Sequence, residues 1–121
     1  FGHTFGHALE RLTGYRHYTH GEAVAIGMNL AACFSVKTGL LTKDQLERIQ
    51  HLLTAVELPL WHSFSLGSDE LIDLMATDKK VRQQRLTLIL PEAIGTVRIE
   101  KELSVAECKT IMKDICHGNT Y

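Results

Sequence analysis

The chain has 121 residues, 45% of them apolar, and a formal net charge of −1, which is the size and balance of one soluble globular domain. Because acidic and basic residues are interspersed, the sequence lacks the electrostatic pattern of a nucleic-acid or anionic-membrane binder. No apolar run approaches the roughly 20 residues that span a bilayer, and no secretory signal pattern occurs. We therefore expect a cytoplasmic protein without nucleic-acid or membrane partners.

The first part of the chain has two helical patterns. His3 to Leu12 predicts a helix that ends at Thr13-Gly14, where glycine suits the left-handed position that follows a helix. A second helix is predicted from His20 to about Lys37. It is apolar on nearly every side, which indicates a buried central helix, and Gly27 would allow a neighbouring backbone to come close.

Two further helices are predicted before residue 78. Thr42 and Gln45 form a potential capping box, and the apolar residues that follow have helical spacing: Leu46, Ile49, Leu52, Leu53 and Val56. Leu58-Pro59-Leu60 would end this helix. Gly67-Ser68-Asp69-Glu70 predicts the start of another helix, which would run to about Met75.

After these helices the pattern changes to that of a β-hairpin. Arg85 to Leu90 alternates as a strand, Thr96 to Ile99 can return as its partner, and Pro91 to Gly95 reads as the loop between them. Ser104 would then cap a last helix from Val105 to about Cys116. The predicted fold is mainly α, with about five helices and a small β-hairpin near residues 85–100.

Cysteine and histidine are the residues with potential chemistry. Cys33, Cys108 and Cys116 are odd in number and lack CxxC spacing, so we expect reduced thiols. Seven histidines are present, five of them before residue 52. Four have no spaced partners and are expected at surface or half-buried positions: His17, His51, His62 and His117.

His3 and His7 are four residues apart, so a helix would present both imidazoles on one face. His20, at the start of the buried helix, could join them around a zinc ion with an open fourth position. Simple packing or helix capping explains His3 and His7 equally well by spacing alone. Glu22 is a possible carboxylate ligand, but a favourable charge in the first turn of a helix is the better interpretation.

Lys79 and Lys80 follow the fourth predicted helix. Two adjacent lysines could hold a phosphate group as point charges. An ordinary solvated turn explains them better when the spacing is taken alone. The chain has no GxGxxG or P-loop motif, so it carries no nucleotide-binding fingerprint of its own.

Four segments together resemble 3-dehydroquinate synthase, a family of the shikimate pathway of aromatic amino acid biosynthesis. They are GHTFGHALE at 2–10, HGEAVAIGM at 20–28, DKK at 78–80 and RLTLILPEAIG at 85–95. The resemblance implies part of the helical C-terminal domain over residues 1–121, with the family's N-terminal NAD-binding domain absent. It also implies NAD as cofactor, Zn²⁺ or Co²⁺ as metal, and a parent enzyme that is a homodimer acting on a sugar phosphate.

The resemblance also assigns roles to individual residues. His3 and His20 match the family's two histidine metal ligands, and the glutamate ligand has no counterpart here. His7 matches a catalytic residue that contacts the substrate phosphate, so the family pattern replaces the three-histidine site. Lys79 or Lys80 would reach the same phosphate, and the pattern does not choose between them.

The implied reaction converts 3-deoxy-D-arabino-heptulosonate 7-phosphate to 3-dehydroquinate and phosphate, a carbon–oxygen lyase reaction. We expect the 121-residue chain alone to be inactive and to self-associate through an apolar surface left uncovered. Two alternatives stay open at this point. One is another sugar-phosphate cyclase, of the 2-deoxy-scyllo-inosose or valiolone type. The other is a non-catalytic helical interaction module, in which His3, His7 and His20 only pack.

Overall fold

A computed structural model describes residues 1–60, 68–78 and 85–117. It contains four helices in the first two ranges, α1 (His3–Leu12), α2 (His20–Lys37), α3 (Lys43–Ala55) and α4 (Ser68–Asp78). These are followed by strands β1 (Arg85–Ala93) and β2 (Thr96–Ser104) and by helix α5 (Val105–His117). The mainly α prediction with one hairpin is confirmed. None of the described helices is both long and apolar enough to cross a membrane.

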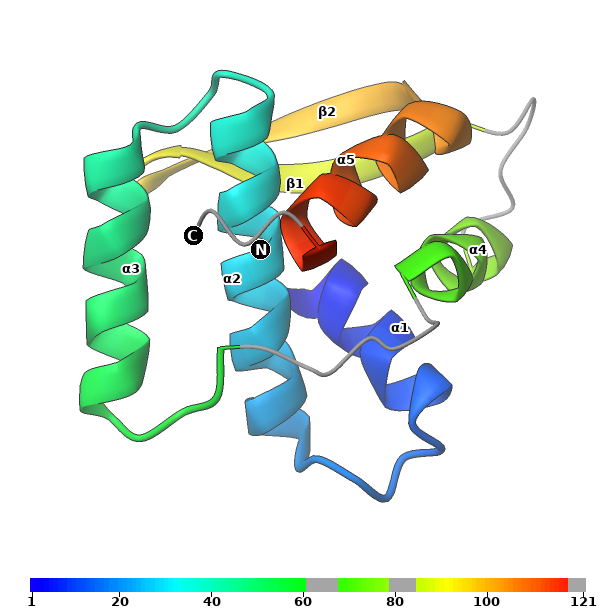
Figure 1. The fold of residues 1–121 in the computed structure, drawn as a ribbon, viewed down its shortest axis with the longest axis horizontal. Helices are drawn as coiled ribbons and strands as arrows, with labels where there is room; N and C mark the ends of the chain where they lie inside the picture. Colours follow the sequence, from blue (N-terminus) through cyan, green and yellow to red (C-terminus); the bar gives the residue numbers. More distant parts are fainter. Residues whose placement is uncertain (61–67, 79–84, 118–121) are drawn as a thin grey trace.

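Helix α2 runs through the middle of the molecule, with α3 beside it and the hairpin lying across one end (Figure 1). It packs against α1, α3, α5 and β1. Eleven of its eighteen residues are buried, including Ile26, Leu30 and Phe34. The buried central helix predicted from the apolar run is therefore confirmed, and the other elements are arranged around it.

The predicted helix starts are confirmed by their capping contacts. The Thr19 hydroxyl accepts from the Glu22 amide, and Thr42 caps α3 through Gln45 in the same way. At α5 the Glu107 amide donates to the Ser104 hydroxyl at 3.4 Å. Each cap satisfies backbone donors that a helix start otherwise leaves without a partner. Helix α4 continues to Asp78 rather than ending near Met75.

The hairpin is longer than predicted, because the segment from Pro91 to Gly95 is not all loop. Pro91 belongs to β1 and pairs with Val97, and the register shifts between Pro91 and Ala93. Proline lacks an N–H and is tolerated at a sheet edge or a bulge, and both conditions hold in this two-stranded sheet. The turn is confined to Ile94 and Gly95, and Gly95 has a φ of 88°.

Buried polar groups tie α2 to its neighbours. Asn29 is fully buried; its side-chain amide donates to the Leu60 carbonyl at 3.0 Å, and its Oδ1 accepts from Gln50 Nε2 at 2.9 Å. Satisfied buried amides of this kind fix the relative position of the elements that they join. Asn29 therefore holds α2 in register with α3.

Two of the three cysteines are described with their side chains. Cys33 and Cys108 are buried free thiols, as predicted. Burial, with a smaller contribution from the Glu107 carboxylate, raises the pKa of the Cys108 thiol to about 11. Because the thiolate is the reactive form, Cys108 is a packing residue at neutral pH.

Candidate metal centre

The candidate site begins with an unusually close contact between α1 and α2. A Cβ atom added to Gly27 would overlap the carbonyl oxygen of Gly2 and lie 2.7 Å from the amide nitrogen of Gly6. A Cβ added to Gly6 would lie 2.9 Å from the carbonyl oxygen of Ala23. Distances this short from a Cβ to backbone atoms require glycine on both helices. The close approach predicted at Gly27 is therefore confirmed.

The two helices run antiparallel in a regular register. Gly2 lies opposite Gly27, Gly6 lies opposite Ala23, and Glu10 reaches His20. Positions 2, 6 and 10 are one helical turn apart on α1, so they follow one side of that helix. The glycine contact thus brings the start of α2 beside the last turn of α1, although the two segments are joined by an exposed connection.

The rings of His3 and His20 come close to one another beside this crossing. The ring centroids of His3 and His20 are 5.6 Å apart, with an interplanar angle of 58°. Two imidazoles on one tetrahedral zinc, with Zn–N bonds of about 2.0–2.1 Å, have ring centres roughly 5 Å apart. The pair therefore fits two ligands of a single metal ion, and both side chains are exposed, which leaves room for further ligands.

The imidazole of His20 also has a carboxylate partner. His20 Nδ1 lies 3.1 Å from Glu10 Oε1. The Glu10 side chain is 12% exposed, whereas that of His20 is 59% exposed. An ionised carboxylate only accepts hydrogen bonds, so a hydrogen bond across this contact has Nδ1 as its donor, and in the neutral imidazole Nε2 is then the nitrogen with the lone pair.

Sequence analysis did not identify Glu10. Within α1 it is one more polar residue, and its partner is ten positions away on another helix. The available signal is the spacing of His3, His7 and Glu10 at i, i+4 and i+7, which places all three on one face of the helix. That spacing does not reveal what faces them across the crossing.

Glu22 has the capping role that the sequence favoured over metal binding. Its carboxylate accepts from the backbone N–H of Thr19 at 2.9 Å, and its own N–H donates to the Thr19 hydroxyl at 3.1 Å. This reciprocal pair is a capping box. Glu22 therefore caps the start of α2.

The three-histidine arrangement does not form. Across the described ranges, no three His, Cys, Asp or Glu side chains are grouped as a metal site would require. His7 is exposed on α1, and its assignment to a phosphate stays a prediction, as do the metal assignments of His3 and His20. Lys79 and Lys80 lie outside the described residues.

The histidines predicted to have no role are exposed where their side chains are described. His17 and His51 are both at the surface, as expected, and the His17 ring packs edge-on against Tyr18 with centroids 4.5 Å apart. The side chains of His62 and His117 are outside the described part of the chain.

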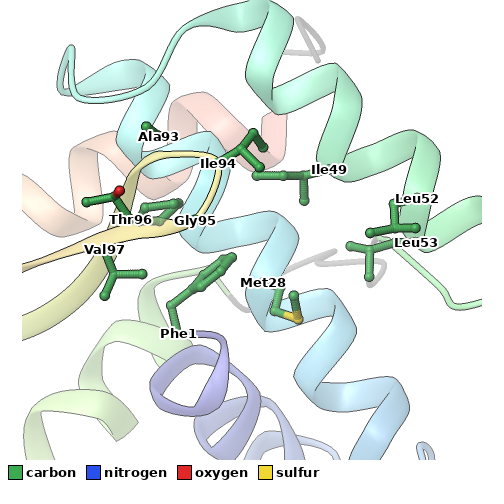
Figure 2. A pocket seen from close by; sticks show the side chains of 11 residues that line it. Phe1, Met28, Ile49, Leu52, Leu53, Ala93, Ile94, Gly95, Thr96 and Val97 are labelled. Carbon is green, nitrogen blue, oxygen red and sulfur yellow. The ribbon is translucent and has the colours of Figure 1, made fainter.

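An apolar hollow of about 220 Å³ lies between α3, α2 and the hairpin turn (Figure 2). Phe1 and Met28 line it from the start of the chain and from α2, and Leu52 lines it from α3. Ile94 and Val97 close it from the hairpin. Leu52 is 66% exposed and Val97 is 51% exposed. Among the described residues, no titratable side chain lines the hollow, so its described lining is almost entirely apolar.

Residues 1–81 match the family described as 3-dehydroquinate synthase C-terminal. The chain belongs to the 3-dehydroquinate synthase family. It is 43% identical over 113 residues to 3-dehydroquinate synthase of Coxiella burnetii (strain Dugway 5J108-111), an alignment that covers 93% of this chain and 32% of that protein. It is 44% identical over 125 residues to the synthase of Bradyrhizobium sp. (strain BTAi1 / ATCC BAA-1182), covering 96% of this chain and 33% of the relative. The chain thus spans about a third of the length of these curated relatives.

Solved structures of related cyclases share the fold. A 2-epi-5-epi-valiolone synthase from Streptomyces hygroscopicus subsp. jinggangensis 5008, with NAD⁺ and Zn²⁺ bound, superposes with a TM-score of 0.78 at 26% identity, over 98% of this chain and 32% of that one. A 2-deoxy-scyllo-inosose synthase complexed with carbaglucose-6-phosphate, NAD⁺ and Co²⁺ superposes with a TM-score of 0.73 at 24% identity, over 94% of this chain and 32% of that one. The helical fold expected from the 3-dehydroquinate synthase resemblance is therefore confirmed.

Proposed function

We propose that these 121 residues are part of a longer 3-dehydroquinate synthase, which converts 3-deoxy-D-arabino-heptulosonate 7-phosphate to 3-dehydroquinate and phosphate. The observation that carries the proposal is the His3–His20 pair, with its ring centroids 5.6 Å apart. Membership of the family, and similarity to relatives that are 3-dehydroquinate synthases, support the reaction and its product. NAD and Zn²⁺ or Co²⁺ are the proposed cofactors, supported by the structural neighbours, which bind NAD⁺ with Zn²⁺ or with Co²⁺.

The chain's own residues would bind and orient the substrate. His3 and His20 would hold the metal, which when bound supplies a Lewis acid for a substrate hydroxyl. His7 and either Lys79 or Lys80 would bind the departing phosphate by charge-assisted hydrogen bonds. Since His3 and His7 lie on one face of α1, the helix would set the distance between the metal and the phosphate.

We further propose that the 121-residue chain is inactive by itself. The described residues bring two imidazoles together but no third metal ligand, and the chain spans about a third of its relatives. The expected result is dehydroquinate formation by the full-length protein with NAD and zinc, and none by the 121-residue chain under the same conditions.

Product analysis tests this function against the runner-up cyclases. The full-length protein is incubated with 3-deoxy-D-arabino-heptulosonate 7-phosphate, sedoheptulose 7-phosphate and glucose 6-phosphate, and the products are identified by mass spectrometry. Formation of a valiolone or an inosose instead of dehydroquinate would move the protein to another class of sugar-phosphate cyclase. No reaction with any substrate would favour a non-catalytic module.

We propose a cytoplasmic homodimer for the full-length synthase, and self-association of the isolated chain through the apolar hollow. Contiguous exposed apolar side chains such as Leu52 and Val97 favour association. We expect Leu52→Glu to lower the apparent mass of the chain in concentration-dependent light scattering. His51→Glu, an adjacent exposed position that does not line the hollow, is the matched control. A chain that is strictly monomeric at high concentration would contradict the proposal.

A further inference from the structure

Glu10 is placed to act on the metal site through His20. Its carboxylate is 3.1 Å from His20 Nδ1. The same His20 ring lies beside the ring of His3, with the two centroids 5.6 Å apart. We propose that Glu10 is a positioning residue that fixes the tautomer and orientation of His20 for binding a divalent metal through Nε2. This inference rests on the proposed metal-dependent function and deepens it.

The contrast in exposure supports a fixed carboxylate and an accessible imidazole. Glu10 is 12% exposed in its side chain, and His20 is 59% exposed. A side chain that is largely buried loses little further conformational freedom when it orients its partner. His20 stands at the first position of α2, where the backbone alone leaves its ring free to rotate. The carboxylate is therefore the group that holds the ring.

The chemistry of histidine ligands gives this contact a consequence. A histidine that binds a metal through one ring nitrogen commonly donates the other N–H to a carboxylate, and loss of that partner typically lowers metal affinity by about 10–100-fold. Donation from Nδ1 to Glu10 leaves Nε2 as the unprotonated nitrogen. It also makes Nε2 a stronger donor toward a cation.

The backbone contact of the two helices keeps Glu10 in place. Gly2 and Gly6 pack against Gly27 and Ala23, and the same side of α1 continues to Glu10. The position of the carboxylate therefore follows from the helix crossing and does not depend on the exposed connection between the helices. Glu22, although two residues from His20, is engaged with Thr19 instead.

The test measures metal affinity in the full-length protein. Metal-free protein is titrated with Zn²⁺ against a chelator for wild type, Glu10→Gln, Glu10→Ala and the matched control Glu22→Gln. We expect dissociation constants to rise about 10-fold for Glu10→Gln, which keeps an acceptor oxygen, and about 100-fold for Glu10→Ala. Glu22→Gln makes the same charge change near His20 without touching the ring, so its affinity should stay within about 2-fold of wild type.

Two spectroscopic readouts separate positioning from other roles. Nitrogen-15 NMR of the His20 ring should show the Nδ1–H tautomer in wild type and a mixture of tautomers in Glu10→Ala. The visible absorption of the Co²⁺ form should keep its shape and intensity in Glu10→Gln, since the ligand set is unchanged. An altered Co²⁺ spectrum would make Glu10 a direct ligand and overturn the inference, as would unchanged Zn²⁺ affinity in both Glu10 variants.

Dehydroquinate formation, measured on the same samples, separates this inference from the proposed function. If the Glu10 variants bind metal more weakly but the wild-type protein makes no dehydroquinate, the inference is kept and the proposed function is rejected. If the wild-type protein makes dehydroquinate and the Glu10 variants bind metal as tightly as wild type, the proposed function is kept and the inference is rejected.

Discussion

Gly27→Ala is expected to lower the free energy of unfolding by about 3 kcal/mol, at the upper end of the cost of overpacking. The new Cβ would overlap the Gly2 carbonyl oxygen and lie 2.7 Å from the Gly6 amide nitrogen. Both atoms are backbone, so no side-chain rotation relieves the overlap, and α1 must move away from α2. Urea unfolding of the chain, followed by circular dichroism at 222 nm, measures the loss.

Gly21→Ala in the same helix is the matched control for Gly27→Ala. A Cβ at Gly21 meets no atom within 4 Å, so the substitution gains helix propensity without a clash. It should raise the free energy of unfolding by up to about 1 kcal/mol. Equal effects of the two substitutions would show that the glycine contact is not what limits the approach of the helices.

His3→Ala and His20→Ala are each expected to lower the metal affinity of the full-length protein by more than about 100-fold. A four-ligand zinc site is worth about 10–16 kcal/mol in total, so one ligand contributes roughly 2.5–4 kcal/mol, or about 10²- to 10³-fold in affinity. Calorimetric titration of the metal-free protein with Zn²⁺ measures the change. The His3–His20 ring distance of 5.6 Å is the basis for expecting similar effects from both.

His7→Ala provides the comparison, because it removes the neighbouring imidazole from the same face of α1. We expect metal affinity to stay within about 2-fold of wild type, because His7 is assigned to the phosphate rather than to the metal site. Inhibition by inorganic phosphate should weaken instead. If His7→Ala lowers metal affinity as much as His3→Ala does, His7 is a third metal ligand and the three-histidine site is correct. If neither His3→Ala nor His20→Ala changes metal affinity, the metal binds elsewhere.

Local signals in the sequence predicted most of the elements correctly. Thr42 and Ser104 were predicted as caps, and each hydroxyl makes its contact within three residues, so these two helix starts follow from local sequence. The apolar run from Ala23 predicted burial of α2, since a helix without a polar face must be covered on all sides. Pro91 misled the hairpin prediction, because proline is a common loop signal, whereas here it pairs with Val97 next to a bulge on an edge strand.

The sequence predicted only those site residues that lie in segments resembling the family. His3 and His20 were paired by the family resemblance, and the structure brings their rings together. Glu10 was missed because its partner is fixed by the helix crossing, a non-local property. The apolar stripe of α3 shows the same limit: periodicity placed Leu52 on an apolar face, but did not show that this face is left 66% exposed at Leu52.

The glycine contact has a consequence for the stretch between α1 and α2. Because backbone atoms of Gly2, Gly6 and Gly27 set the spacing of the two helices, the connection from Gly14 to Thr19 is not needed to hold His3 near His20. Residues 14–17 are exposed, and a Cβ at Gly14 meets nothing within 4 Å. This turn is therefore a suitable insertion point for an affinity tag or a fluorescent reporter. We expect the two halves produced by a cut there to reassemble through the glycine contact.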